Sequence, residues 1–213
     1  MAPVEVRERL ALGPERLRAA LAGLQIELAR GDACGRPHAG AAEVAILSTC
    51  NRTEVYAWAG VHAEMVIRRH LAERGGLEPQ AGDTILYARH GEGAACHLLR
   101  VAAGLDSLVI GENEILGQVK SAFELAHAAG TTGPMLSALF RYAVQAGKRV
   151  RSETEIGRAA LSVATIVVEM AQETFGALVD RTALLIGAGK MSSITGQALV
   201  RAGLRCVLVA NRT

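Results

Sequence analysis

The chain has 213 residues, a length that suits one large domain or two small ones. Hydrophobic residues make up 50% of it and the formal net charge is +2, so a core can form and no global field attracts polyanions. It has no apolar run of about 18 residues, which a membrane span requires, and the start MAPVEVRERL lacks the apolar stretch of a signal peptide. Its 4 cysteines stand apart without a CxxC pair, which argues against a zinc site or redox dithiol and favours a reducing cytoplasm.

The first ninety residues alternate between helix and strand signals. Pro14 follows Gly13 and opens a run of leucines at helical spacing. The predicted elements of this part are a helix from Pro14, strands over 44–47 and 54–58, a helix over 63–75 and a strand over 84–90. Such a mixture predicts a small α+β unit.

The pattern becomes helical from about residue 92 and changes again at 182. Four helices are predicted, over 91–105, 115–130, 133–154 and 162–176, the last with Gly176 at its C′ position. TALLIGAG then predicts a buried strand that runs into glycines, KMSSITGQALVRAG a helix and RCVLVANRT a second buried strand. This βαβ unit needs further strands to bury its faces, so we expect the chain to stop within a domain.

The glycine turn after the strand over 182–186 resembles a dinucleotide-binding turn. Gly187 permits a tight bend, and Gly189 lets the backbone approach a pyrophosphate at the helix N-terminus. Ser192 replaces the third glycine, so an ordinary strand–helix turn stays open as the alternative. The next strand ends in Asn-Arg-Thr rather than the acidic residue of NAD enzymes, which favours a 2′-phosphate and hence NADP.

A cysteine stands in the polar segment between the strands over 44–47 and 54–58. Cys50 becomes a nucleophile if its thiolate is stabilised by a cation or by backbone donors. Arg52 is a source of positive charge or a partner for a substrate carboxylate, and Thr49, Asn51 and Thr53 add hydrogen-bonding groups. The alternative is an inert buried thiol at a strand end.

Two further stretches carry candidate site residues. His97 lies in a predicted helix and is able to act as a general acid or base, although most helical histidines do not. Small polar residues crowd the segment GLDSLVIGENEILGQVK, over 104–120, which predicts either a pocket wall or a plain helix–loop–helix corner. A thiol, an NADP turn and a polar pocket together suggest attack on an acyl group followed by hydride reduction of a thioester.

Three motifs, LSTCNRTEVY, GLDSLVIGENEILGQVK and LLIGAGKM…VANRT, resemble in this order the signature segments of glutamyl-tRNA reductase. The resemblance implies an α/β protein: an α+β catalytic domain over 1–160 with a helical second half, then the first βαβ of a Rossmann-like NADP-binding domain over 161–213. It implies NADPH-dependent formation of glutamate-1-semialdehyde from glutamyl-tRNA(Glu), the first step of tetrapyrrole biosynthesis. It also implies that the full-length protein is a cytoplasmic homodimer and does not associate with a membrane. Glutamate-1-semialdehyde aminomutase is a candidate partner.

The resemblance carries over to individual positions of this chain. Cys50 matches the nucleophile and His97 the histidine important for activity. The positions that match the surroundings of the glutamyl group are Thr49, Asn51, Arg52, Ser107, Glu112, Asn113, Glu114 and Gln118. The positions that match the NADPH site are Gly187, Ala188, Gly189, Lys190, Met191, Ser192, Asn211, Arg212 and Thr213. No metal site is implied.

The chain departs from the family pattern in three places. A strand that usually precedes the opening segment is absent, and so are the rest of the nucleotide domain and the dimerisation domain. Glu114 stands where the family commonly has glutamine, and its charge would repel a substrate carboxylate unless screened. We therefore expect this chain alone to be a poor reductase. Two alternatives stay open: a non-catalytic fragment or paralogue that binds a partner, and another NADP-dependent cysteine acyl reductase.

Overall fold

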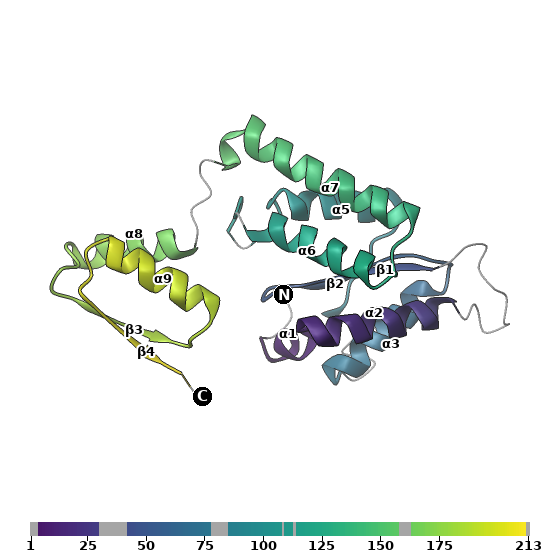
Figure 1. Ribbon diagram of the computed structural model, residues 1–213, viewed down its shortest axis with the longest axis horizontal. Helices are drawn as coiled ribbons and strands as arrows, with labels where there is room; N and C mark the ends of the chain where they lie inside the picture. The colour runs from purple at the N-terminus through teal and green to yellow at the C-terminus, as the bar shows by residue number, and fades with distance from the viewer. Residues whose placement is uncertain are drawn as a thin grey trace. The chain divides into compact units, whose positions relative to one another are not determined.

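The computed structural model describes residues 4–29, 42–77, 85–107, 109–112, 114–157 and 163–211 (Figure 1). The chain forms two compact units. The first comprises Met1–Ala103 and Glu114–Arg149, and the second comprises Gly104–Asn113 and Val150–Thr213. The expected domain boundary at residue 160 stays a prediction.

The first unit is built around an antiparallel hairpin. Strands β1 (Glu43–Ser48) and β2 (Thr53–Trp58) pair in a register that sets Ser48 opposite Thr53. Helix α2 (Pro14–Ala29) contacts β1, and so does α6 (Glu114–Ala128). Residues 43–47 of β1 are therefore buried on both faces, and the helices enclose the hairpin as two layers (Figure 1). The turn that joins β1 to β2 carries Cys50.

The helices predicted from periodicity are confirmed. The other helices that the structure describes in the first unit are α1 (Val4–Leu10), α3 (Ala63–Gly75), α5 (Gly91–Ala102) and α7 (Pro134–Glu153). Helix α1 was not predicted. The strand predicted over 84–90 is wrong, because residues 86–90 have no regular structure. The Leu86 carbonyl accepts a hydrogen bond from Arg68 of α3 at 3.1 Å, instead of pairing with a strand.

A buried carboxylate ties β1 to α7. Glu43 accepts backbone hydrogen bonds from Met135 at 3.1 Å and from Leu136 at 2.7 Å. These amides belong to the first turn of α7, where backbone N–H groups have no partner within the helix. Phe140 of the same helix is fully buried and meets Tyr56 of β2 edge-to-face, with 5.4 Å between the ring centroids. The core thus locks α7 against the hairpin.

The second unit contains a parallel strand–helix–strand arrangement. Its elements are the 3₁₀-helix η1 (Glu155–Gly157), α8 (Val163–Phe175), β3 (Thr182–Ile186), α9 (Lys190–Arg201) and β4 (Cys206–Ala210). Strands β3 and β4 were expected to be buried, but Leu184, Ile186 and Leu208 are exposed. Helix α9 contacts both strands, but alternate residues of β3 are only half-buried and the others are exposed, whereas a parallel sheet is normally covered on both faces.

Among the described residues, no helix has both the length and the apolar composition that crossing a membrane requires.

Candidate active site

Cys50 lies on the turn between β1 and β2, and its side chain is exposed. The turn is held by its own hydrogen bonds: the Thr49 amide donates to the Arg52 carbonyl at 2.8 Å. The Thr49 hydroxyl accepts from the amides of Asn51 and Arg52, each at 3.2 Å. The thiol is therefore presented to solvent on an ordered turn, and the Thr49 hydroxyl is engaged in shaping that turn. A direct role of Thr49 toward substrate stays a prediction.

The N-terminal segment forms hydrogen bonds with this turn. Arg7 of α1 donates through Nη1 to Asn51 Oδ1 at 2.8 Å, so the Asn51 side chain also has a structural partner. The Leu12 amide donates to Ser48 Oγ at 2.9 Å, and Thr53 Oγ1 donates to the Leu10 carbonyl at 3.3 Å. Both ends of the cysteine turn are thereby tied to residues 10–12.

The carboxylate of Glu54 contacts four other side chains. Arg52 Nη1 lies 3.0 Å from Glu54 Oε1, and His97 Nε2 of α5 lies 2.9 Å from the same oxygen. Tyr87 donates its hydroxyl to Oε1 at 3.1 Å, and Tyr56 donates to Oε2 at 2.5 Å. The side chains of Glu54, Arg52 and His97 are 9–11% exposed. The structure thus brings Arg52 and His97, two of the predicted site residues, onto a shared partner.

The electrostatics of this cluster favour an ionised Glu54. Burial alone would raise the pKa of Glu54, but hydrogen bonds from His97 and Tyr56 and the positive charges of His97 and Arg52 outweigh burial and lower it. Burial, followed by the neighbouring Glu54 charge, raises the pKa of Tyr56 far above its ordinary value. At neutral pH a carboxylate therefore faces a neutral phenol that donates to it.

Sequence reasoning missed Glu54, Tyr56, Tyr87 and Arg7. Glu54 and Tyr56 are two residues apart in β2, so their side chains lie on the same face of the hairpin. This spacing could have identified them as neighbours. Tyr87 and Arg7 approach from segments far away in the chain, and no spacing rule indicates their contacts.

The other predicted substrate residues fall at two places. Glu114 and Gln118 lie on α6, half-buried and one helical turn apart, so they share a face of that helix. Ser107 and Glu112 lie in a loop of the second unit. Asn113 lies outside the described residues. The roles of these residues toward substrate stay predictions.

The glycine turn has the backbone form that was expected. Gly187 has φ +105°, the left-handed region that favours glycine, and its amide donates to the Ala210 carbonyl at 2.7 Å. Gly189 precedes α9, and a Cβ built there would meet nothing within 4 Å. Ala188 is exposed, Met191 and Ser192 are half-buried beside it, and Asn211 is exposed after β4. Arg212, Thr213 and the side chain of Lys190 lie outside the described residues.

Another glycine supplies the close helix–strand contact that the third fingerprint position usually provides. A Cβ on Gly196 of α9 would lie 3.1 Å from Leu185 Cδ1. The substitution of the third glycine by Ser192 therefore does not prevent α9 from packing closely on β3.

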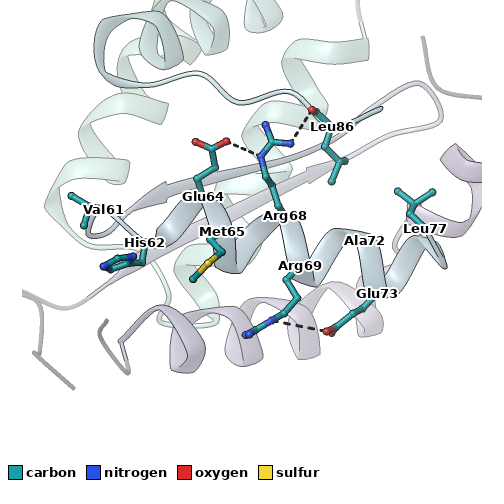
Figure 2. A pocket seen from close by; sticks show the side chains of 10 residues that line it. All are labelled: Val61, His62, Glu64, Met65, Arg68, Arg69, Ala72, Glu73, Leu77 and Leu86. Atoms are coloured by element: carbon teal, nitrogen blue, oxygen red, sulfur yellow. Dashed lines mark hydrogen bonds and ion pairs between the residues drawn. The ribbon is translucent and has the colours of Figure 1, made fainter. Parts of the chain in front are cut away.

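A surface hollow of about 660 Å³ runs along α3 and is lined by ten residues (Figure 2). Figure 2 shows Arg68 bonded to Glu64 and to the Leu86 carbonyl, and Arg69 paired with Glu73. Because carboxylates lie against both arginines, this hollow is a poor match for a polyanion. It contains none of the predicted site residues.

The two units define a class: two-part α/β proteins that join a thiol-bearing unit to a dinucleotide-type βαβ unit. The family model "Glutamyl-tRNAGlu reductase, N-terminal domain" matches residues 1–154, and "Shikimate / quinate 5-dehydrogenase" matches residues 169–213. The chain belongs to the glutamyl-tRNA reductase family, which confirms the resemblance read from its motifs and the expected fold class. The second match indicates a nicotinamide-binding fold.

Individual relatives agree with this assignment. Glutamyl-tRNA reductases from Marinobacter nauticus and Geobacillus thermodenitrificans are 44% and 45% identical, with 100% of this chain and 47% and 45% of the relatives covered. The structure of "Glutamyl-tRNA Reductase from Methanopyrus kandleri" matches with a TM-score of 0.57 at 37% identity, covering 100% of this chain and 47% of that one. The chain spans about half the length of these relatives.

Proposed function

We propose that this chain carries the glutamyl-transfer chemistry of an NADPH-dependent glutamyl-tRNA reductase, the first step of tetrapyrrole biosynthesis. One observation carries the proposal: Cys50 is exposed on an ordered turn, two residues from an arginine that shares a carboxylate with His97. A nucleophile needs access, a fixed geometry and nearby groups able to handle charge and protons.

The first step is attack of the Cys50 thiolate on the ester carbonyl of glutamyl-tRNA. A carbon–sulfur bond forms and the bond to the ribose oxygen breaks, so glutamate becomes a thioester and the tRNA leaves as a free hydroxyl once it takes up a proton. His97 is the proposed proton donor, because an imidazole titrates near neutrality and Glu54 holds this ring in place.

Arg52 is the proposed partner of a substrate carboxylate. A guanidinium pairs well with carboxylates, and Glu54 fixes this one at 3.0 Å from its own Oε1. Thr49, Asn51, Ser107, Glu112, Asn113, Glu114 and Gln118 complete the proposed surroundings of the glutamyl group. Because Glu114 is a carboxylate, we place it away from the substrate's own carboxylate.

The glycine turn fits the cofactor that the family uses. Gly187, Ala188, Gly189, Lys190, Met191 and Ser192 would hold the pyrophosphate at the N-terminus of α9, because a Cβ is absent where the backbone must be approached. Asn211, Arg212 and Thr213, at and after the end of β4, would face the 2′-phosphate. NADPH, when bound, supplies the hydride that reduces the thioester to glutamate-1-semialdehyde. A homodimer and an association with the aminomutase remain proposals drawn from the family.

The test uses the purified chain and glutamyl-tRNA that carries labelled glutamate, without NADPH. We expect the label to become attached to the protein, and Cys50→Ser to abolish attachment, whereas Cys96→Ser, also at an exposed cysteine, retains it. Release of free glutamate without NADPH would show a working thiol that lacks the reductive step. No attachment to the parent chain would favour a binding module.

A further inference from the structure

Tyr87 is the exposed member of the Glu54 cluster. It lies in the segment of residues 86–90, which has no regular structure, and 62% of it is exposed. Its hydroxyl nevertheless donates to Glu54 Oε1 at 3.1 Å, although the Glu54 side chain is only 10% exposed. A tyrosine hydroxyl needs a protein partner only when it is buried, because water bonds to an exposed one. The contact of Tyr87 therefore points to a role at this carboxylate.

The same tyrosine also contacts His97, which shares the Glu54 oxygen. The Tyr87 hydroxyl lies 3.4 Å from His97 Nε2, so the two groups converge on Oε1. The two rings meet edge-to-face, with 5.9 Å between their centroids and 85° between their planes. The Arg89 guanidinium lies 5.5 Å from the centroid of the Tyr87 ring, a distance that suits a cation–π contact. Tyr87 therefore packs its ring against the imidazole and bonds its hydroxyl to the same acceptor.

The segment that carries Tyr87 is attached to helix α3 on both sides of the tyrosine. Before it, the Leu86 carbonyl accepts from Arg68 at 3.1 Å (Figure 2). After it, His90 Nε2 lies 2.9 Å from Glu64 Oε2. Glu64 also pairs with Arg68 at 2.7 Å, so one ion pair on α3 serves both attachments. These contacts place Tyr87 without the support of a helix or a strand.

We propose that Tyr87 is a positioning residue that holds His97 against Glu54 and keeps water out of the acceptor position beside the imidazole. An ionised carboxylate offers about four acceptor positions, and the side chains around Glu54 occupy them. Loss of the Tyr87 hydroxyl opens one position to water, which then competes with His97 for Oε1. The effect on glutamyl transfer rests on the proposed function, whereas the hold on His97 does not. Tyr87 acts through His97 and Glu54 and touches no reacting atom.

NMR of the histidine rings tests the hold without any activity. The signal of the His97 ring proton on Nε2 is identified by its loss in His97→Gln. We expect this proton to exchange with water at least about tenfold faster in Tyr87→Phe than in the parent, because exchange follows the opening of the hydrogen bond. Tyr142→Phe, at a tyrosine of α7 that is 65% exposed, is the matched control and should exchange like the parent. Equal exchange in Tyr87→Phe and the parent, or a parent proton as labile as that of free imidazole, would overturn the hold.

Single-turnover transfer of labelled glutamate tests the consequence for the reaction. Tyr87→Phe should lower the rate at saturating glutamyl-tRNA by roughly tenfold, the loss expected when one hydrogen bond to a charged group is removed. The half-saturating concentration should stay near that of the parent, because Tyr87 is not assigned to the substrate. Tyr87→Leu should be at least as slow, since it also removes the ring, and Tyr142→Phe should match the parent. A change in the half-saturating concentration alone would overturn the positioning role.

The outcomes separate this proposal from the proposed function. If the parent transfers no glutamate but Tyr87→Phe still speeds exchange of the His97 ring proton, the proposed function fails and the hold stands. If Tyr87→Phe transfers glutamate at the parental rate, the positioning role is overturned and the proposed function stands.

Discussion

Glu54 Oε1 lies 2.9 Å from His97 Nε2, and this contact joins strand β2 to helix α5. An ionised carboxylate only accepts hydrogen bonds, so His97 Nε2 carries the proton that it donates to Glu54, and this bond sets the orientation of the ring. The same oxygen takes Arg52, which follows Cys50 by two residues. The charged Glu54 therefore holds in place both His97, the proposed proton donor, and Arg52, the proposed partner of a substrate carboxylate.

Glu54→Gln should destabilise the first unit at neutral pH by about 1–3 kcal/mol, because buried donors lose a charged acceptor. The native pKa of Glu54 lies below its ordinary 4.5, so its contribution is present above that value and is lost as the pH falls through the native pKa. The difference between parent and variant should therefore be largest near pH 7 and shrink in acid. Urea unfolding followed through the single tryptophan, Trp58 of β2, measures this difference.

The matched control for that experiment is Glu64→Gln on α3. Glu64 pairs with Arg68 at 2.7 Å, but its side chain is 36% exposed, so its loss should change the unfolding free energy far less. A Glu54→Gln effect no larger than that of Glu64→Gln at pH 7 would contradict the organising role of Glu54.

Replacing either of two glycines of the first unit by alanine should change the free energy of unfolding, but in opposite directions. A Cβ on Gly147 of α7 would lie 2.6 Å from the Ala102 carbonyl, so Gly147→Ala should destabilise by about 1–3 kcal/mol. Gly117 of α6 has nothing within 4 Å, so Gly117→Ala should stabilise by about 0.5–1 kcal/mol through helix propensity. The same tryptophan-monitored unfolding compares them, and equal signs would contradict the close approach of Gly147 to the Ala102 carbonyl.

Local patterns predicted most of the fold. Apolar residues at helical spacing lead directly to α5, α6 and α7, since each of these helices has one buried face. The predicted strand over 84–90 fails because a strand needs a partner, and the Leu86 carbonyl is instead bound by Arg68, a contact between segments far apart in sequence. The exposure of β3 and β4 depends on what covers them, which their apolar composition does not reveal.

The candidate site was only partly predictable. Cys50 and Arg52 stood out because both lie in one short polar segment, and the motif resemblance added His97. The sequence did not single out Glu54, because a glutamate in a strand is common. Its role depends on the contacts with His97 and Tyr87, which form only in the folded protein. Contacts between distant segments create this cluster, and the local spacing of residues does not predict such contacts.

Gly189→Ala should weaken NADPH binding while leaving the fold nearly unchanged. A Cβ there meets no protein atom within 4 Å, so the change in unfolding free energy should stay below about 1 kcal/mol. The added methyl group would instead occupy the space through which a pyrophosphate approaches the backbone. NMR titration of the amides at the start of α9 with NADPH measures the affinity, even where binding is weak.

Gly196→Ala is the control for this prediction. Its Cβ would press on Leu185 Cδ1 at 3.1 Å, so it disturbs packing on β3 and leaves the proposed pyrophosphate site open. Gly196→Ala should therefore bind NADPH like the parent. Equal affinity of Gly189→Ala and the parent would rule out the glycine turn as the site of the pyrophosphate.

Mass spectrometry of the protein after brief mixing with glutamyl-tRNA, quenched in acid and then digested, tests the central claim most directly. The account predicts that the peptide containing Cys50 gains the mass of one glutamyl group as a hydroxylamine-sensitive thioester, and that the peptides containing Cys96 and Cys206 do not. A glutamyl group on another residue, or discharge of the tRNA that continues in Cys50→Ser, would contradict it.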